Sequence, residues 1–155
     1  QLPLQEGTLA DEEKLDAREL QGGAVIPEAP VLIVDDNELN ILVARKMIEN
    51  WGYDVVVAMD SVEAEKVLSE SSPFLVLLDI HMPGRDGFQA ASDWRAMGGE
   101  WLNLPIIGLT ADAETHTRNR ALASGMNEVV VKPFNPPHLR SLIEVSARNW
   151  GQSLS

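Results

Sequence analysis

In the stretch LVLLDIHMPG, residues 75–84, a run of apolar residues ends abruptly at Asp79. Methionine, proline and glycine follow almost at once. A short, continuous apolar run of this kind, closed by turn residues, is typical of a strand buried on both faces of a parallel sheet. The run therefore places one carboxylate at the carboxyl end of a strand. A single aspartate there can be a turn residue, so its role depends on which other side chains reach the same edge.

Similar runs alternate with helical patterns along the rest of the chain. Strands are predicted at residues 30–36, 53–59, 74–79, 105–110 and 128–131, and helices at 38–51, 61–69, 88–97, 113–124 and 137–150. Five strands, each followed by a helix, predict an α/β fold. Because crossovers between parallel strands are right-handed, the expected architecture is a five-stranded, doubly wound parallel sheet with helices on both faces, as in flavodoxin-like folds.

Composition narrows the classes of function. The 155 residues include 24 acidic and 12 basic side chains, a net charge of −12, which opposes nonspecific binding to nucleic acid or to an anionic membrane surface. The absence of cysteine excludes disulfides and thiolate metal sites. The apolar runs are too short to span a bilayer, and no signal peptide opens the chain. We therefore expect an excised fragment that works in the cytoplasm, whether or not its parent chain is anchored in a membrane.

The chain divides near residue 30. Residues 1–28 carry seven acids and two bases, and their apolar residues are spaced too thinly for an independent core. We therefore expect a solvated acidic linker, with a short helix between Thr8 and Leu20 as the alternative. Residues 29–151 form the predicted folded domain, and residues 152–155 form a short tail.

Polar side chains end four of the five predicted strands. The first strand ends in Asp35 and Asp36, the third in Asp79, the fourth in Thr110 and the fifth in Lys132. In open α/β sheets, ligands bind beyond the carboxyl ends of the strands, where the strand order reverses. These five side chains are therefore expected to converge on one rim.

The charges of this rim indicate its chemistry. Two carboxylates ~5 Å apart repel by ~3 kcal/mol at an effective dielectric near 20, and one ammonium group cannot neutralise three of them. Oxygen ligands without His or Cys side chains favour Mg²⁺, with Mn²⁺ as the alternative ion. When the ion and the lysine neutralise the rim, one carboxylate can attack phosphorus as a nucleophile.

Four stretches resemble the receiver domain of two-component response regulators. They are LIVDDNELN, LVLLDIHMPGRDGF, PIIGLTADA and GMNEVVVKPF, and they occur in the family's order and spacing between residues 30 and 150. DDNELN and GMNE are most similar to receivers attached to hybrid histidine kinases. The resemblance implies a phosphoacceptor domain that catalyses its own phosphorylation and dephosphorylation, and not a conventional turnover enzyme.

The resemblance also implies roles for the acidic residues. Asp79 would be the phosphoacceptor and a ligand of Mg²⁺. Asp36 would bind the ion directly, Asp35 would act through bound water, and His81 would offer its backbone carbonyl.

On the neighbouring strands, Thr110 would bond a phosphoryl oxygen and Lys132 would bridge first Asp79 and then the phosphoryl group. The family pattern further implies a cis peptide before Pro133. One position departs from the pattern, because Val129 stands where many receivers carry an aromatic residue that moves with the threonine. A valine has no ring to swing, so switching by that route is not expected here.

The implied partner is a histidine kinase phosphoacceptor helix or a histidine phosphotransfer protein, with no nucleic acid and no direct membrane contact. Since only five residues follow Trp150, we expect the terminal receiver of a hybrid sensor kinase, with a stand-alone regulator as the alternative. Phosphorylation would then alter the surface of residues 113–124, 128–131 and 137–150 by a population shift.

Three rival functions share parts of this pattern. A flavodoxin-like cofactor binder needs a phosphate-cradling loop after the first strand, where Asp35 and Asp36 would repel phosphate. An aspartyl phosphatase is expected to place its D-x-D pattern after the first strand, whereas Asp79 follows the third. An interaction module without phosphorylation is disfavoured because the rim residues are all present.

The first predicted helix suggests a docking surface. Its buried stripe is expected to comprise Asn40, Val43, Ala44, Met47, Ile48 and Trp51. Leu42 lies opposite that stripe and Leu39 beside it, near the rim, where a histidine-bearing helix would dock. His116 and His138 are expected on helix surfaces.

Overall fold

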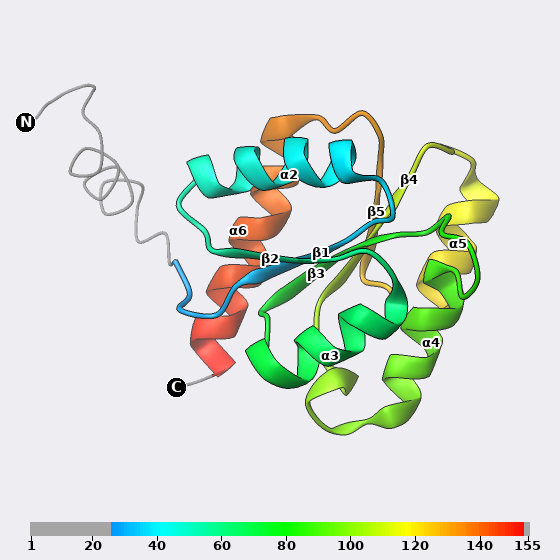
Figure 1. The fold of residues 1–155 in the computed structure, drawn as a ribbon, viewed down its shortest axis with the longest axis horizontal. Coiled ribbons are helices and arrows are strands. Elements are labelled where there is room, and N and C mark those ends of the chain that lie inside the picture. Colours follow the sequence, from blue (N-terminus) through cyan, green and yellow to red (C-terminus); the bar gives the residue numbers. More distant parts are fainter. Residues whose placement is uncertain (1–25, 154–155) are drawn as a thin grey trace, which may run out of the picture.

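The computed structural model describes residues 26–153, with side chains through residue 150. Five strands and five α-helices alternate along this range, and one short 3₁₀ helix is added before the fourth strand (Figure 1). The strands are β1 (Val31–Val34), β2 (Val55–Ala58), β3 (Leu75–Asp79), β4 (Ile106–Thr110) and β5 (Glu128–Val131). The helices are α2 (Glu38–Asn50), α3 (Ser61–Ser71), α4 (Gly87–Met97), η1 (Gly99–Leu102), α5 (Thr115–Ala123) and α6 (Pro136–Ser153).

All five strands run parallel in the order β2-β1-β3-β4-β5. The order reverses between β1 and β3, because the chain steps outward to β2 and then returns to the other side of β1. The register pairs Val34 with Leu78, so the residues that follow β1 lie beside the end of β3. The predicted doubly wound α/β fold is confirmed.

Helices cover both faces of the sheet (Figure 1), α2 and α6 on one face and α3, α4 and α5 on the other. Along β3, Leu75 and Leu77 join the core beneath α2 and α6, whereas Val76 and Leu78 join the core beneath the other three helices. Burial on both faces explains why this strand is a continuous apolar run instead of an alternating one.

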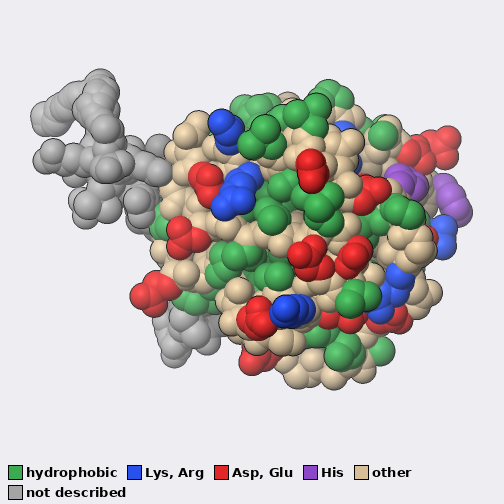
Figure 2. Space-filling model, in the orientation of Figure 1, with side chains coloured by type: hydrophobic (Ala, Val, Ile, Leu, Met, Phe, Trp, Pro, Cys, Tyr) green, Lys and Arg blue, Asp and Glu red, His purple; other side chains and the backbone are tan. Residues whose placement is uncertain are grey.

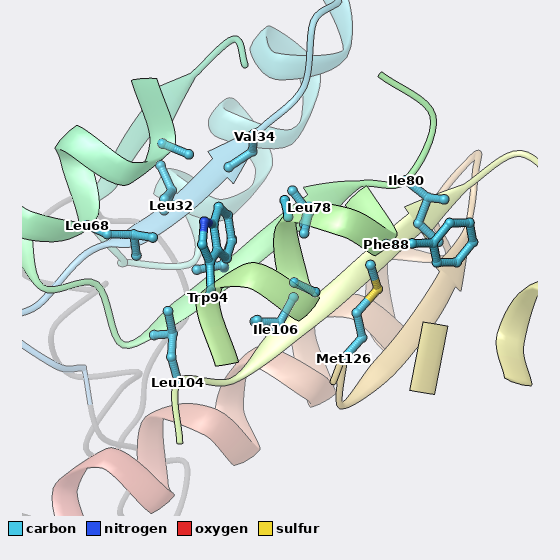
Figure 3. Packing of buried hydrophobic residues seen from close by; sticks show 14 of the residues in the cluster. Leu32, Val34, Leu68, Leu78, Ile80, Phe88, Trp94, Leu104, Ile106 and Met126 are labelled. Atoms are coloured by element: carbon cyan, nitrogen blue, oxygen red, sulfur yellow. The ribbon is translucent and has the colours of Figure 1, made fainter. Parts of the chain in front are cut away.

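A buried tryptophan joins α3 and α4. Trp94 of α4 is fully buried, and its indole N–H donates to Glu65 of α3 at 3.0 Å. Figure 3 shows it within a cluster that includes Leu32 of β1, Leu68 of α3 and Leu78 of β3. The buried N–H thus has a partner, and one side chain joins two helices to the sheet.

Some element boundaries differ from the predicted ones. Helix α5 begins at Thr115 and not at 113, because the Asp112 side chain accepts the Glu114 N–H at 2.8 Å and holds a turn there. Helix α6 continues past the predicted end at Trp150 as far as Ser153. The short helix considered between Thr8 and Leu20 lies outside the described residues.

The predicted buried stripe of α2 was partly wrong. Val43 is 50% exposed, whereas Ile41 is 8% exposed and packs beneath the helix with Ala44 and Ile48. Apolar residues lie on both sides of this helix, so its periodicity alone could not tell which side faces the sheet. The predicted exposure of Leu42, at 48%, is confirmed.

Candidate functional site

Three aspartates meet at the carboxyl end of the sheet. Asp35 and Asp36 directly follow β1, and Asp79 is the last residue of β3, the neighbouring strand. One carboxylate oxygen from each of the three lies within 4.8 Å of the others. Asp35 and Asp79 are buried and Asp36 is exposed, so the cluster opens to solvent on one side.

A lysine that directly follows β5 reaches across to this cluster. The Lys132 ammonium lies 3.2 Å from Asp35 Oδ2 and 3.5 Å from Asp79 Oδ1. The backbone N–H of Lys132 donates to the Thr110 carbonyl at 2.7 Å, which ties the lysine to the end of β4. The peptide between Lys132 and Pro133 is cis, as predicted. The residues that the sequence placed on the rim are therefore close in space.

Thr110 completes the rim at the end of β4. It is fully buried, and its Oγ1 accepts the Asp112 N–H at 3.0 Å. A second neighbour is His81 in the exposed loop after β3, whose Nε2 lies 3.3 Å from Thr110 Oγ1. The His81 backbone N–H donates to Asp79 Oδ1 at 3.3 Å. His81 thus contacts both a carboxylate and the hydroxyl of the rim.

The surroundings of Asp79 disfavour its charged form. Burial raises the pKa of this carboxyl above its usual value of 3.8, and the nearby charge of Asp35 raises it further. The Lys132 charge and the His81 N–H act in the opposite direction without cancelling the increase. Further positive charge in the site would stabilise the charged form of a carboxylate held in this way.

The donor set suits a hard divalent cation. Three carboxylates face one ammonium group, so the cluster keeps excess negative charge, and the donors that meet there are oxygens. Mg²⁺ prefers one or two protein carboxylates together with water and phosphate oxygens. Asp36, exposed at the mouth of the cluster, is open to such an ion.

The loop after Asp79 is held close to the strand by a glycine. A Cβ on Gly87 would lie 2.7 Å from the Asp79 carbonyl oxygen and 2.8 Å from Ile80 Cα, both backbone atoms. The Gly87 N–H donates to the Ile80 carbonyl at 2.8 Å. Only glycine allows this close return of the chain.

Arg85, in the same loop, was not predicted to have a role. Its guanidinium donates to Ser61 Oγ at 2.9 Å, to Asp93 at 3.1 Å and to Glu65. These partners lie on α3 and α4, so the arginine fastens the loop to two helices. No local sequence signal indicates it, because Ser61 and Glu65 are 24 and 20 residues away along the chain.

Val129 of β5 is the residue that departs from the receiver pattern, in which an aromatic side chain is common at this position. It is partly buried and packs against the core beneath α3, α4 and α5. His116 and His138 are both exposed, as predicted.

Comparison with known proteins identifies the family. The family model for the response regulator receiver domain matches residues 31–144, which contain the whole sheet and the rim. The chain belongs to the receiver domain family. A receiver domain is a phosphoacceptor and not a classical enzyme, and its similarity to receivers of hybrid sensor kinases places this chain in two-component signalling.

Several curated relatives are sensor kinases. The chain is 37% identical over 123 residues to the sensor histidine kinase RcsC of Escherichia coli K12, and this alignment covers 79% of the chain and 13% of RcsC. It is 36% identical over 115 residues to the sensor protein GacS of Pseudomonas syringae, covering 73% of the chain and 13% of GacS. The receiver domain therefore spans only about an eighth of these relatives.

Solved structures agree with the fold. The receiver domain of the sensor histidine kinase PA1611 of Pseudomonas aeruginosa is 30% identical, with a TM-score of 0.70 over 78% of this chain and 98% of that one. Its structure holds a magnesium ion coordinated in the active site cleft. The chemotaxis protein CheY4 of Vibrio cholerae is 27% identical, with a TM-score of 0.72 over 77% of this chain and 99% of CheY4. No helix in the described part of the receiver has the length and hydropathy needed to cross a membrane.

Proposed function

We propose that Asp79 is the phosphoacceptor of this receiver domain and takes its phosphoryl group from a histidine of a kinase or phosphotransfer protein. An Asp79 carboxylate oxygen would form a bond to phosphorus while the phosphorus–nitrogen bond to the imidazole breaks, and the imidazole would regain a proton from water. The observation that carries this proposal is the position of a buried carboxylate, Asp79, in a cluster with two further carboxylates and next to the Lys132 ammonium.

The other rim residues fit supporting roles. Asp36, Asp79 and the backbone carbonyl of His81 would hold Mg²⁺, or Mn²⁺ in its place, and Asp35 would act through a bound water. The ion would neutralise the carboxylates and stabilise negative charge on the phosphoryl oxygens. Lys132 would contact the phosphoryl group, and Thr110 would donate to one of its oxygens. The same groups would serve in the receiver's own dephosphorylation.

A direct test uses acetyl phosphate as the donor, which removes the need for a partner protein. With Mg²⁺ present, the chain is expected to gain one phosphoryl group, seen by intact mass and located at Asp79 by peptide mapping. With Mg²⁺ removed by EDTA, uptake should cease because Lys132 alone cannot neutralise the three carboxylates. No uptake in either condition, or uptake at another residue, would favour an interaction module that does not use phosphorylation.

We further propose that residues 29–151 are the receiver and residues 1–28 an acidic linker, within a hybrid sensor kinase. The similarity to RcsC and GacS supports a hybrid kinase over a stand-alone regulator. The receiver would act in the cytoplasm, where histidine kinases carry their phosphoryl groups. Residues 152–155 would form a short tail, of which the first two residues continue α6.

The exposed apolar face of α2 fits a partner helix. Leu39, Leu42 and Val43 are 66%, 48% and 50% exposed, and α2 begins next to Asp35 and Asp36. Figure 2 shows hydrophobic side chains gathered on the upper surface of the molecule, where Figure 1 places α2. A contiguous apolar patch beside a reactive rim is a docking surface for a histidine-bearing helix.

The Leu42→Asp variant tests this surface. Phosphotransfer from a panel of phosphorylated histidine phosphotransfer proteins is expected to slow about tenfold, because a charge would be buried in the interface. Uptake from acetyl phosphate should stay unchanged, since that donor needs no docking. Leu102→Asp is the matched control, because Leu102 is 54% exposed on η1 at the opposite end of the sheet. Equal effects of both variants on transfer would exclude α2 as the docking surface.

A further inference from the structure

The contact between Thr110 and His81 joins a buried hydroxyl to an exposed ring. Thr110 lies at the end of β4 with no exposed surface, whereas His81 belongs to the loop after β3 and is exposed. Their side chains meet at 3.3 Å, between Oγ1 and Nε2. The contact spans 29 residues of sequence and links the end of β4 to the loop that follows Asp79.

The hydrogen-bonding capacity of Thr110 assigns the direction of this bond. A threonine hydroxyl has one hydrogen to donate and two lone pairs to accept with. The Asp112 N–H already donates to Oγ1 at 3.0 Å. Among the described residues, His81 Nε2 is the remaining partner recorded for this oxygen, and a buried hydroxyl hydrogen without an acceptor is costly. Thr110 therefore donates and His81 accepts, which places the ring proton on Nδ1.

We propose that His81 is a positioning residue that holds the Thr110 hydroxyl in its resting orientation and so slows phosphoryl uptake. This inference rests on the proposed function, in which the same hydroxyl donates to a phosphoryl oxygen. The Thr110 hydroxyl has a single hydrogen to donate, so its hydrogen bond to His81 must break before the one to the phosphoryl group can form. His81 and the incoming group compete for one donor.

The loop after Thr110 is held in place, so the competition involves movement of the Thr110 and His81 side chains alone. Two hydrogen bonds fix the Asp112 side chain. Its Oδ2 accepts one from the Thr117 hydroxyl at 2.6 Å, and its Oδ1 accepts one from the Glu114 N–H at 2.8 Å. The backbone next to Thr110 is thereby fixed, and the hydroxyl can re-aim by rotation without movement of the loop. Val129, on the neighbouring strand β5, has an apolar side chain that could not take over as acceptor. The imidazole released from Thr110 would turn to solvent at the mouth of the site.

Two substitutions of His81 distinguish the effect of its hydrogen-bond acceptor on the uptake rate from the effect of the ring's size. His81→Ala removes the acceptor and is expected to speed uptake from acetyl phosphate by about fivefold, the size of one ordinary hydrogen bond. His81→Gln keeps an acceptor at a similar reach and should stay within about twofold of the wild-type rate. His116→Ala, which removes an exposed imidazole on α5, is the matched control and should leave the rate unchanged.

A double-mutant cycle shows whether His81 acts through Thr110. In a Thr110→Ala background the hydroxyl is gone, so adding His81→Ala should change the rate by less than about twofold. A full acceleration in that background would overturn the proposal, because His81 would then act through some other group. An unchanged or slower rate in the single His81→Ala variant would overturn it as well.

Nuclear magnetic resonance of the resting protein gives a readout without any phosphoryl donor. The ¹⁵N shifts of the His81 ring are expected to show an unprotonated Nε2 that accepts a hydrogen bond, and His81→Ala should shift the Thr110 and Asp112 amide signals. A proton found on Nε2 would overturn the inference. Because this result does not require phosphorylation, it stands or falls separately from the proposed acceptor role of Asp79.

Discussion

The Asp79→Asn variant is expected to take up no phosphoryl group from acetyl phosphate and, near neutral pH, to be more stable than the wild-type receiver. An amide cannot serve as the nucleophile, so intact mass should show no phosphoryl gain. The free energy of unfolding, measured by urea denaturation, should rise by about 1–2 kcal/mol. Two carboxylates about 5 Å apart repel by about 3 kcal/mol at an effective dielectric near 20, and Lys132 offsets part of this.

The gain in stability should depend on pH in a defined direction. Burial and the charge of Asp35 raise the pKa of Asp79 in the folded state above 3.8. The folded protein therefore binds this proton more tightly than the unfolded chain does, and wild-type stability falls as pH rises through the folded-state pKa. The difference between Asp79→Asn and wild type should accordingly be largest above that pKa and vanish below pH 3.8.

Asp54→Asn is the matched control, because Asp54 is an exposed aspartate directly before β2. It makes the same chemical change outside the acidic cluster and should alter neither phosphoryl uptake nor stability. A stabilisation of equal size in both variants would show that the gain comes from lower net charge in general and not from relief of repulsion at the rim.

The fold could be predicted because its signals are local. Buried strands of a parallel sheet are continuous apolar runs, and β1 and β3 match the predicted runs closely. The rim followed from topology, since parallel strands bring their carboxyl ends to one edge and the chain places Asp35, Asp79 and Lys132 there. Strand polarity thus allowed distances between remote residues to be anticipated without any long-range information.

The features that were not predicted depend on contacts between loops or on helix rotation. Apolar residues surround much of α2, so only packing on the sheet decides that Ile41 is buried and Val43 exposed. The bonds of Arg85 to α3 and of His81 to Thr110 join segments that share no periodic pattern. Side chains in loops reach partners in directions that no repeat in the sequence indicates, so the sequence alone does not predict these contacts.

The Lys132→Met variant is expected to slow phosphoryl uptake from acetyl phosphate by about 100-fold or more, the usual cost of losing one charged group that stabilises a transition state. Methionine keeps a long, unbranched side chain but removes the charge that lies 3.2 Å from Asp35 and 3.5 Å from Asp79. Rates are measured by intact mass at saturating Mg²⁺. Lys66→Met, a change at an exposed lysine on α3, is the control and should leave the rate unchanged.

The resting protein should also lose stability in Lys132→Met, because the carboxylates of Asp35 and Asp79 then face each other without a cation. The Lys132 charge lowers the pKa of Asp79, so its removal should raise that pKa further and steepen the fall of stability with rising pH. Combining Lys132→Met with Asp79→Asn separates charge from packing, since the amide no longer repels Asp35. Most of the lost stability should return in the double variant. A loss that persists unchanged would mean that Lys132 stabilises the rim through its packing and not by neutralising its acids.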